Sequence, residues 1–175
     1  YEVVQQIDIL QLSDNKNSKT SKSIQKVFLS SGVSVNLETL ETLPDFATTS
    51  NYDLIIVNAV NDPSSGITQS LVDFTSNGGT VLIIPDSVNN SSRAELLRTK
   101  LGFGEGKVWH KTNNPEPLKN IKFSHPLFNG VFLTPPNRMD MPVSDRCISR
   151  KVTDDEEVLG STSRGYPFLS RVAVG

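Results

Sequence analysis

The sequence predicts an α/β protein whose core is an open, mostly parallel, doubly wound sheet with helices on both faces. Residues 54–57 and 81–84 are short, continuously apolar runs, a pattern typical of strands buried on both faces of a parallel sheet. Between them, Ile67, Leu71 and Phe74 recur at i, i+4 and i+7, which is the spacing of one helix face. Strand, helix and strand within about 35 residues form a right-handed βαβ unit, the building block of such a sheet.

The segments before this unit have weaker patterns. Val3–Leu12 alternates loosely between apolar and polar residues and is compatible with a strand. The polar run 13–21 predicts a loop. In Ser21–Ser30 three apolar residues fall at i, i+3 and i+4, which predicts a short helix that Gly32 can end. Residues 33–40 then form a second strand candidate.

The segments after this unit change character along the chain. A helix is expected over Ser92–Leu101, with Ser91 or Asn90 as its N-cap. Beyond residue 106, short β-like segments alternate with proline-rich turns. These segments are residues 107–110, 131–133, 147–152, 157–160 and 168–174. We expect them to form a β-rich C-terminal extension of the same sheet, within a single domain that covers residues 1–175.

Charge and cysteine content exclude several classes of function. The formal net charge is -2, and no segment concentrates Lys and Arg enough to bind phosphates in a stripe, so we expect no nucleic-acid partner. The single cysteine, Cys147, can form no internal disulfide and provides no zinc-binding spacing. We therefore expect no metal and no cofactor, and an inert thiol at Cys147.

The compartment is left open by the sequence. The chain begins without Met and ends on residues 172–175 like the start of another strand, so we expect a fragment of a longer protein. It lacks a signal-peptide pattern, and no run approaches the ~18 apolar residues of a membrane span. We expect a soluble domain in the periplasmic part of a membrane protein, with a cytoplasmic location as the alternative. Contact with the membrane is expected only through the spans of the parent protein.

Residues 52–85, YDLIIVNAVNDPSSGITQSLVDFTSNGGTVLIIP, resemble the core of class I glutamine amidotransferase-like domains. The later motifs HPLFNGVF (125–132) and NRMDMPV (137–143) resemble the C-terminal domain of bacterial membrane proteins of the aerotolerance (Bat-type) group. The amidotransferase-like domain of gliding-motility transporter auxiliary proteins is similar in the same core strands. The resemblance covers residues 50–143 and implies a flavodoxin-like, amidotransferase-like fold.

The residues that give this family its activity are absent at the matching positions. The resemblance implies a cysteine nucleophile after the strand 80–84, where a helix N-terminus stabilises the thiolate, and a late His-x-Glu pair. This chain has Pro-Asp-Ser at 85–87, and neither His110 nor His125 is followed by Glu two positions on. We therefore expect a non-catalytic binding or scaffolding module of a larger, membrane-anchored bacterial protein, with protein partners or a small polar ligand.

Two alternatives stay open. The first is a hydrolase or amidotransferase-like enzyme that uses Ser87 or Asp86 with His125. A nucleophile elbow requires small neighbours, whereas Ser87 lies between Pro85 and Asn89 at that spacing, so a turn or N-cap role is favoured for it. The second alternative is a periplasmic carbohydrate- or peptide-binding domain.

The expected ligand-binding residues follow two neighbouring strands. Asn58 and Asn61 follow the first strand, and Asp86, Ser87 and Asn89 follow the second. Ligands of open α/β sheets bind outside the carboxyl ends of the strands. A rim of amides and hydroxyls can hydrogen-bond a small polar ligand or a peptide but is poorly suited to generating a nucleophile. The sequence therefore predicts a ligand site made of these five residues.

Overall fold

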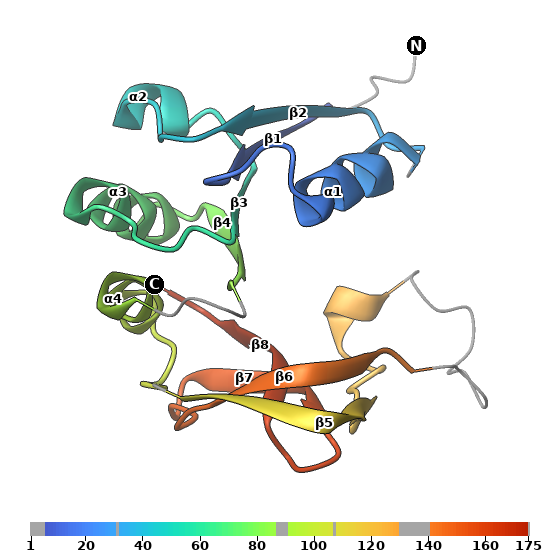
Figure 1. The fold of residues 1–175 in the computed structure, drawn as a ribbon. Coiled ribbons are helices and arrows are strands. Elements are labelled where there is room, and N and C mark those ends of the chain that lie inside the picture. The colour runs from blue at the N-terminus through green and yellow to red at the C-terminus, as the bar shows by residue number, and fades with distance from the viewer. Residues whose placement is uncertain (1–5, 31, 87–90, 107, 130–140, 175) are drawn as a thin grey trace. The chain divides into compact units, whose positions relative to one another are not determined.

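The structure is a computed structural model that describes residues 6–30, 32–86, 91–106, 108–129 and 141–174 (Figure 1). The chain divides into two compact units. The first contains residues 1–101 with 174–175, and the second contains residues 102–173. Each unit contains one four-stranded sheet. The single domain expected over residues 1–175 stays a prediction.

The first unit contains a parallel sheet with the strand order β2-β1-β3-β4. Its strands are β1 (Ile7–Leu12), β2 (Val35–Leu40), β3 (Leu54–Asn58) and β4 (Thr80–Ile84). In register, Leu10 of β1 lies beside Ile55 of β3, and Ile56 of β3 lies beside Leu82 of β4. Because all four strands run the same way, their carboxyl ends lie at one edge of the sheet.

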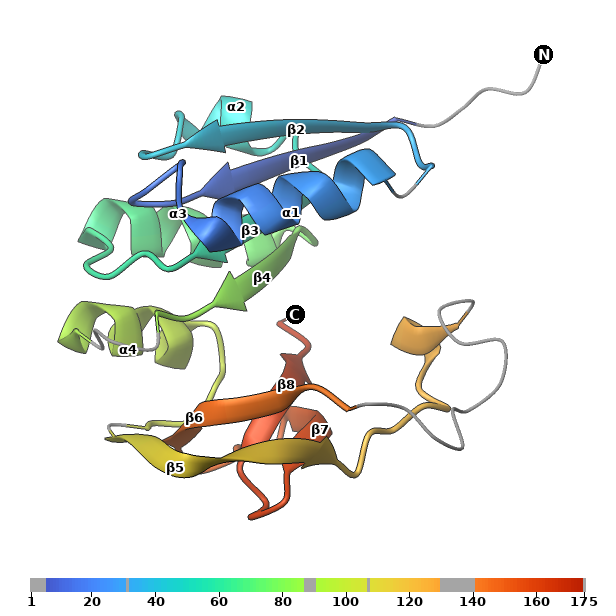
Figure 2. The same ribbon diagram turned by 45° about the vertical axis from the view of Figure 1, so that its right-hand side comes forward.

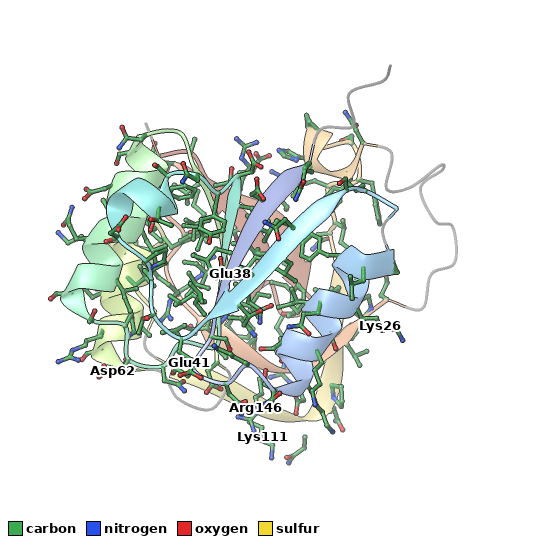
Figure 3. The ribbon with its side chains drawn as sticks, turned by 90° about the horizontal axis from the view of Figure 1, so that it is seen from above. Lys26, Glu38, Glu41, Asp62, Lys111 and Arg146 are labelled. Atoms are coloured by element: carbon green, nitrogen blue, oxygen red, sulfur yellow. The ribbon has the colours of Figure 1, made fainter. Side chains whose placement is uncertain are left out.

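Helices cover both faces of this sheet (Figures 2 and 3). The helices are α1 (Lys19–Ser30), α2 (Phe46–Thr49), α3 (Ser65–Ser76) and α4 (Ser92–Lys100). The helix α1 lies on one face, and α2 and α3 lie on the other. The N-cap of α3 is Ser64, whose hydroxyl accepts a hydrogen bond from the Ile67 N–H. Just after α3, Gly78 has φ 89°, a backbone conformation that glycine adopts without a steric penalty.

The core of the first unit is made of aliphatic side chains from β1 and β3 together with the inner faces of the helices. Its side chains are at most 4% exposed and include Ile9, Leu10, Leu12, Ile55, Ile56, Val57, Leu71, Phe74 and Leu97. The predicted strands over 54–57 and 80–84 and the helix between them are confirmed. The N-cap of α4 is Ser91, one of the two residues that the sequence offered for this role.

The second unit is a curled antiparallel sheet with the strand order β6-β5-β7-β8 (Figure 2). Its strands are β5 (Val108–Lys119), β6 (Val143–Ser149), β7 (Glu156–Thr162) and β8 (Pro167–Val172), and a 3-10 helix, η1 (Pro126–Phe128), precedes β6. The pairing of β5 with β6 shifts between Lys111 and Glu116. Two prolines, Pro115 and Pro117, lie at or beside this shift and cannot donate to the ladder, which is a common setting for a bulge.

The predicted fold class is wrong in its architecture. We expected one open, mostly parallel, doubly wound, flavodoxin-like sheet with the C-terminal strands as an extension of it. The C-terminal strands instead form a separate antiparallel sheet. The physical reason is local pairing: β7 and β8 are joined by a tight turn with Gly165 at φ 84°, and antiparallel neighbours need only such short connections. The α/β character of the chain is confirmed.

Candidate functional site

Asn58 ends β3 at the carboxyl edge of the parallel sheet and is fully buried. Its Nδ2 donates to the hydroxyl of Ser21 in α1 at 2.9 Å. The Ser21 hydroxyl in turn donates to the carbonyl of Asn15 at 3.0 Å and accepts from the hydroxyl of Ser18 at 2.9 Å. Asn58 therefore joins the end of β3 to the first turn of α1 and to the loop before it.

The backbone takes an uncommon conformation directly after Asn58. Ala59 has φ 52°, in the left-handed region, where a residue with a Cβ atom is strained by roughly 1–2 kcal/mol. Its N–H donates to the carbonyl of Ile84 at the end of β4 at 2.8 Å, which holds the chain in this conformation. Strained backbone held by its surroundings clusters at functional sites. The strained backbone at Ala59 therefore makes the loop between β3 and α3 the strongest candidate site at this edge.

Asn61 cross-links three loops through its main chain. Its N–H donates to Asp14 Oδ2 at 2.9 Å, and its carbonyl accepts from the hydroxyl of Ser91, the N-cap of α4. The next residue, Asp62, forms an ion pair with Arg93 at 2.9 Å. The side-chain oxygen of Asn61 is buried and makes no hydrogen bond within the described residues. It is thus an acceptor that the loop contacts do not use.

The structure brings three of the five predicted ligand-binding residues to one edge. Asn58 and Asn61 flank the strained residue after β3, and Asp86 is half-buried just after β4. Ser87 and Asn89 lie outside the described residues. The side-chain oxygens of Asn58 and Asn61 are both buried without a hydrogen-bond partner within the described residues, whereas the amide nitrogen of Asn58 is bound to Ser21. The assignment of these five residues to ligand binding stays a prediction.

Sequence reasoning missed the polar residues of β1 and α1 that complete this edge. Gln11 and Ser21 are fully buried, and the Ser13 hydroxyl lies 3.3 Å from that of Ser21. Neither side-chain polar atom of Gln11 has a hydrogen-bond partner within the described residues. The available signal was the period of the strand, which places Gln11 on the same face as Ile9 and Ser13. A helical serine facing the end of a strand has no such signal.

His125 lies in the second unit and has partners there for both ring nitrogens. Its Nδ1 accepts from the Leu127 N–H at 3.1 Å, which caps η1. Its Nε2 lies 3.3 Å from Glu157 Oε2 and 3.4 Å from Arg171 Nη1. This is the geometry of a structural histidine. The pairing of His125 with Ser87 or Asp86 stays a prediction, because Ser87 lies outside the described residues and Asp86 belongs to the first unit.

Cys147 is buried in β6 and has the environment of an unreactive thiol. Burial, followed by the nearby carboxylate of Glu116, raises the pKa of this thiol, while Arg164 lowers it by a smaller amount. A thiol that stays protonated is a poor nucleophile and a poor metal ligand. Among the described residues, no group of three or more His, Cys, Asp or Glu side chains is placed to hold a metal ion.

Comparisons with known proteins identify the fold but not a family. No protein-family model and no curated protein matches the sequence. Among solved structures, the chain is similar to the cytoplasmic protein STM3548 from Salmonella typhimurium, with a TM-score of 0.66, 12% identity, and 94% of this chain and 81% of that chain covered. It is similar to the mmIFT52 N-terminal domain, with a TM-score of 0.66, 14% identity, and 95% and 78% covered.

A third similar structure is a much longer enzyme. The alpha-L-fucosidase isoenzyme 2 from Paenibacillus thiaminolyticus matches with a TM-score of 0.59 and 16% identity, and the match covers 89% of this chain but 23% of that one. Identities this low establish a shared fold alone.

In the parts of the chain that the structure describes, none of the helices has the length and apolar character needed to cross a membrane. The Bat-type resemblance stays a prediction.

Proposed function

We propose that this chain is a non-catalytic, glutamine amidotransferase-like module that binds a ligand or a protein partner. In this proposal it belongs to the periplasmic part of a larger, membrane-anchored bacterial protein. The proposal rests on the hydrogen bonds that the polar groups make at the carboxyl edge of the parallel sheet. Asn58, Asp14 and Ser91 bind other groups of the same edge, so they hold loops together instead of activating a nucleophile.

The chemistry of the remaining candidates supports the same conclusion. A nucleophile needs a base within hydrogen-bond reach, and the base needs an available nitrogen or oxygen. Both nitrogens of His125 face partners within the second unit, and burial keeps the thiol of Cys147 protonated. The similarity to 23% of a longer fucosidase chain supports a role as one module among others.

Asn61 allows a sharp test of binding at this edge. Its contacts to Asp14 and Ser91 use main-chain atoms, so Asn61→Ala removes the unused side-chain acceptor and leaves the loop contacts in place. The test measures thermal stabilisation of the full chain by a panel of sugars, peptides and amino-acid amides. We expect a shift for one ligand class that Asn61→Ala reduces and the exposed control Asn51→Ala does not.

Enzyme assays test the alternative that the chain is a hydrolase. Hydrolysis of glutamine and of simple esters is measured on the full chain and on Ser87→Ala, and no hydrolysis above background is expected for either. Hydrolysis that disappears in Ser87→Ala would replace the proposal with the enzyme alternative. An absence of stabilisation by every ligand class would leave scaffolding between proteins as the form of the proposal that survives.

A further inference from the structure

One line of residues along α1 is cationic and points away from the sheet. Lys19, Lys22, Lys26 and Leu29 lie at i, i+3, i+7 and i+10, which places them on one side of the helix, and all four are exposed. The fully buried Ser21 marks the opposite side, which faces the sheet. Figure 3 shows Lys26 on the outer side of α1. We call Lys19, Lys22, Lys26 and Leu29 the outer stripe.

The outer stripe is positively charged within a chain that is negative overall. Residues 15–37 contain four lysines and no Asp or Glu, whereas the whole chain has a formal net charge of -2. Within the part of the chain that the structure describes, the lysines of the stripe take part in no ion pair. The lysines are dispersed in the linear sequence, and the helix brings them to one side.

The outer stripe also exposes aliphatic surface. Leu29, at its C-terminal end, is 86% exposed. Transfer of an exposed apolar side chain from water to an apolar environment is favourable. Lysine side chains can extend past such a surface, because their aliphatic stems are long and flexible. The stripe therefore offers cationic groups and an insertable apolar side chain on the same exposed side of the helix.

We propose that the outer stripe of α1 docks on an anionic membrane surface, which is a direct contact beyond the parent-protein spans that the sequence led us to expect. The ammonium groups of the lysines meet lipid phosphates, and the side chain of Leu29 enters the interface, which is how basic amphipathic helices bind membranes. The stripe contains no arginine fork and no aromatic ring, so it lacks the groups that favour nucleic acids and phosphopeptides. The proposal is independent of the proposed function, because the stripe lies on the side of α1 away from the contact between Ser21 and Asn58.

The test is flotation of the full chain with lipid vesicles. One set of vesicles is pure phosphatidylcholine, and the other is equal parts of phosphatidylcholine and phosphatidylglycerol. We expect binding to the anionic vesicles alone, weakening as salt is added. Each lysine near an anionic surface strengthens binding about fivefold, so the triple variant Lys19→Gln, Lys22→Gln, Lys26→Gln should lose on the order of 100-fold in partitioning.

Matched controls separate docking from net charge. The variant Lys100→Gln, Lys119→Gln, Lys151→Gln removes three exposed lysines elsewhere and should lose far less binding. Leu29→Gln should weaken binding, whereas Leu96→Gln, at a side chain 47% exposed in α4, should not. Circular dichroism spectra confirm that each variant is folded. Equal losses in the two triple variants would overturn the proposal, as would equal binding to neutral vesicles.

Two further outcomes would assign the outer stripe to another partner. Binding of duplex DNA more tightly than of the anionic vesicles, lost in the stripe variant, would assign the stripe to nucleic acid. Salt-sensitive self-association that disappears in the stripe variant, measured by analytical ultracentrifugation without lipid, would assign it to contacts between copies of the chain. Either result would overturn docking on membranes.

Discussion

The two units of the chain bury different kinds of polar side chain. In the described part of the first unit, the buried polar residues are all neutral: Gln11, Ser13, Ser21, Thr49, Asn58, Thr68 and Thr75. In the described part of the second unit they include two acids, Glu116 and Glu156. The second unit also buries fewer apolar side chains. The first unit therefore buries apolar and neutral polar side chains, whereas the second also buries carboxylates that need an arginine partner.

Each of the two buried acids of the second unit lies beside an arginine. Glu156, whose side chain is fully buried, binds the guanidinium of Arg150, which also donates to the Ser170 hydroxyl at 3.1 Å. The centre of the Phe103 ring lies 5.6 Å from the same guanidinium. The carboxylate of Glu116 lies 2.8 Å from the Arg164 guanidinium. A buried pair such as Arg150 with Glu156 contributes little net stability when intact but is costly to break, because one buried charge is left alone.

The largest expected effect comes from breaking the buried pair of the second unit. Arg150→Met leaves the Glu156 carboxylate without its charged partner, and we expect a loss of about 3–5 kcal/mol in the free energy of unfolding. The chain's single tryptophan, Trp109, lies in β5, so its fluorescence during urea unfolding reports on this unit. Arg93→Met breaks the exposed pair with Asp62 and should cost about 0–1 kcal/mol.

A double variant sharpens this prediction. Arg150→Met combined with Glu156→Leu removes both charges, so it should lose less stability than Arg150→Met alone. The helices of the described structure all belong to the first unit except η1, so far-ultraviolet circular dichroism reports mainly on the first unit. Equal shifts of the fluorescence and dichroism midpoints in Arg150→Met would contradict the contrast between the units.

Acid should destabilise the second unit before the first. Burial alone would raise the pKa of Glu156, but the hydrogen bonds from Arg150 and Ser170 outweigh it and hold the pKa below its ordinary value of 4.5. The stability contributed by this carboxylate is present above the unfolded-state pKa and is lost as pH falls through the lower folded-state value. In urea titrations at decreasing pH, the Trp109 transition should weaken first. If the dichroism transition weakens first instead, acid sensitivity does not follow the buried carboxylates.

A smaller effect is expected from the neutral network of the first unit. Asn58→Ala removes the donor to the Ser21 hydroxyl and leaves a buried hydroxyl with one partner fewer. Such a loss costs about 1–3 kcal/mol. The dichroism transition should move, its shift should not depend on pH between neutral and mildly acidic values, and the fluorescence transition should stay. A pH-dependent shift would mean that a charged group takes part in this network.

The same contrast explains how much the sequence could predict. The strands of the first unit alternate with helices, and strands such as Leu54–Asn58 have continuous apolar runs, so periodicity found them. The acidic run Asp154 to Glu157 has the composition of a solvated turn, yet Glu156 is buried and paired with Arg150. Burial of a charge depends on a partner that the fold supplies, and no local pattern contains that information.

The candidate site, like the fold, could be predicted only in part from the sequence. The rule that ligands bind beyond carboxyl ends of strands placed Asn58, Asn61 and Asp86 at one edge. The strained backbone of Ala59 was not predictable, because alanine carries no sequence signal for a positive φ. The short helix α2 was missed as well, since a helix of one turn has no measurable periodicity.

The smallest expected effect is an alkaline one, and it belongs to the first unit. The hydroxyl of Tyr52 donates to Glu38 Oε2 at 2.5 Å, and this hydrogen bond, together with burial, raises the pKa of Tyr52 from 10.0 to about 12. The pKa is raised in the folded state, so the stability that the phenol contributes is present below pH 10 and is lost as pH rises through about 12. Because the pair is partly exposed, Tyr52→Phe should cost at most about 1 kcal/mol at neutral pH.

Absorbance of tyrosinate during an alkaline titration measures this directly. A late step, which is a rise in tyrosinate absorbance at about pH 12, should be present in the unaltered chain and in Tyr166→Phe. It should disappear in Tyr52→Phe. Glu38→Gln should bring the step to lower pH, because a neutral amide oxygen accepts the hydrogen bond less strongly than a carboxylate. A late step that persists in Tyr52→Phe would place the perturbed phenol elsewhere. The contact between Tyr52 and Glu38 would then contribute nothing to the dependence of stability on alkaline pH.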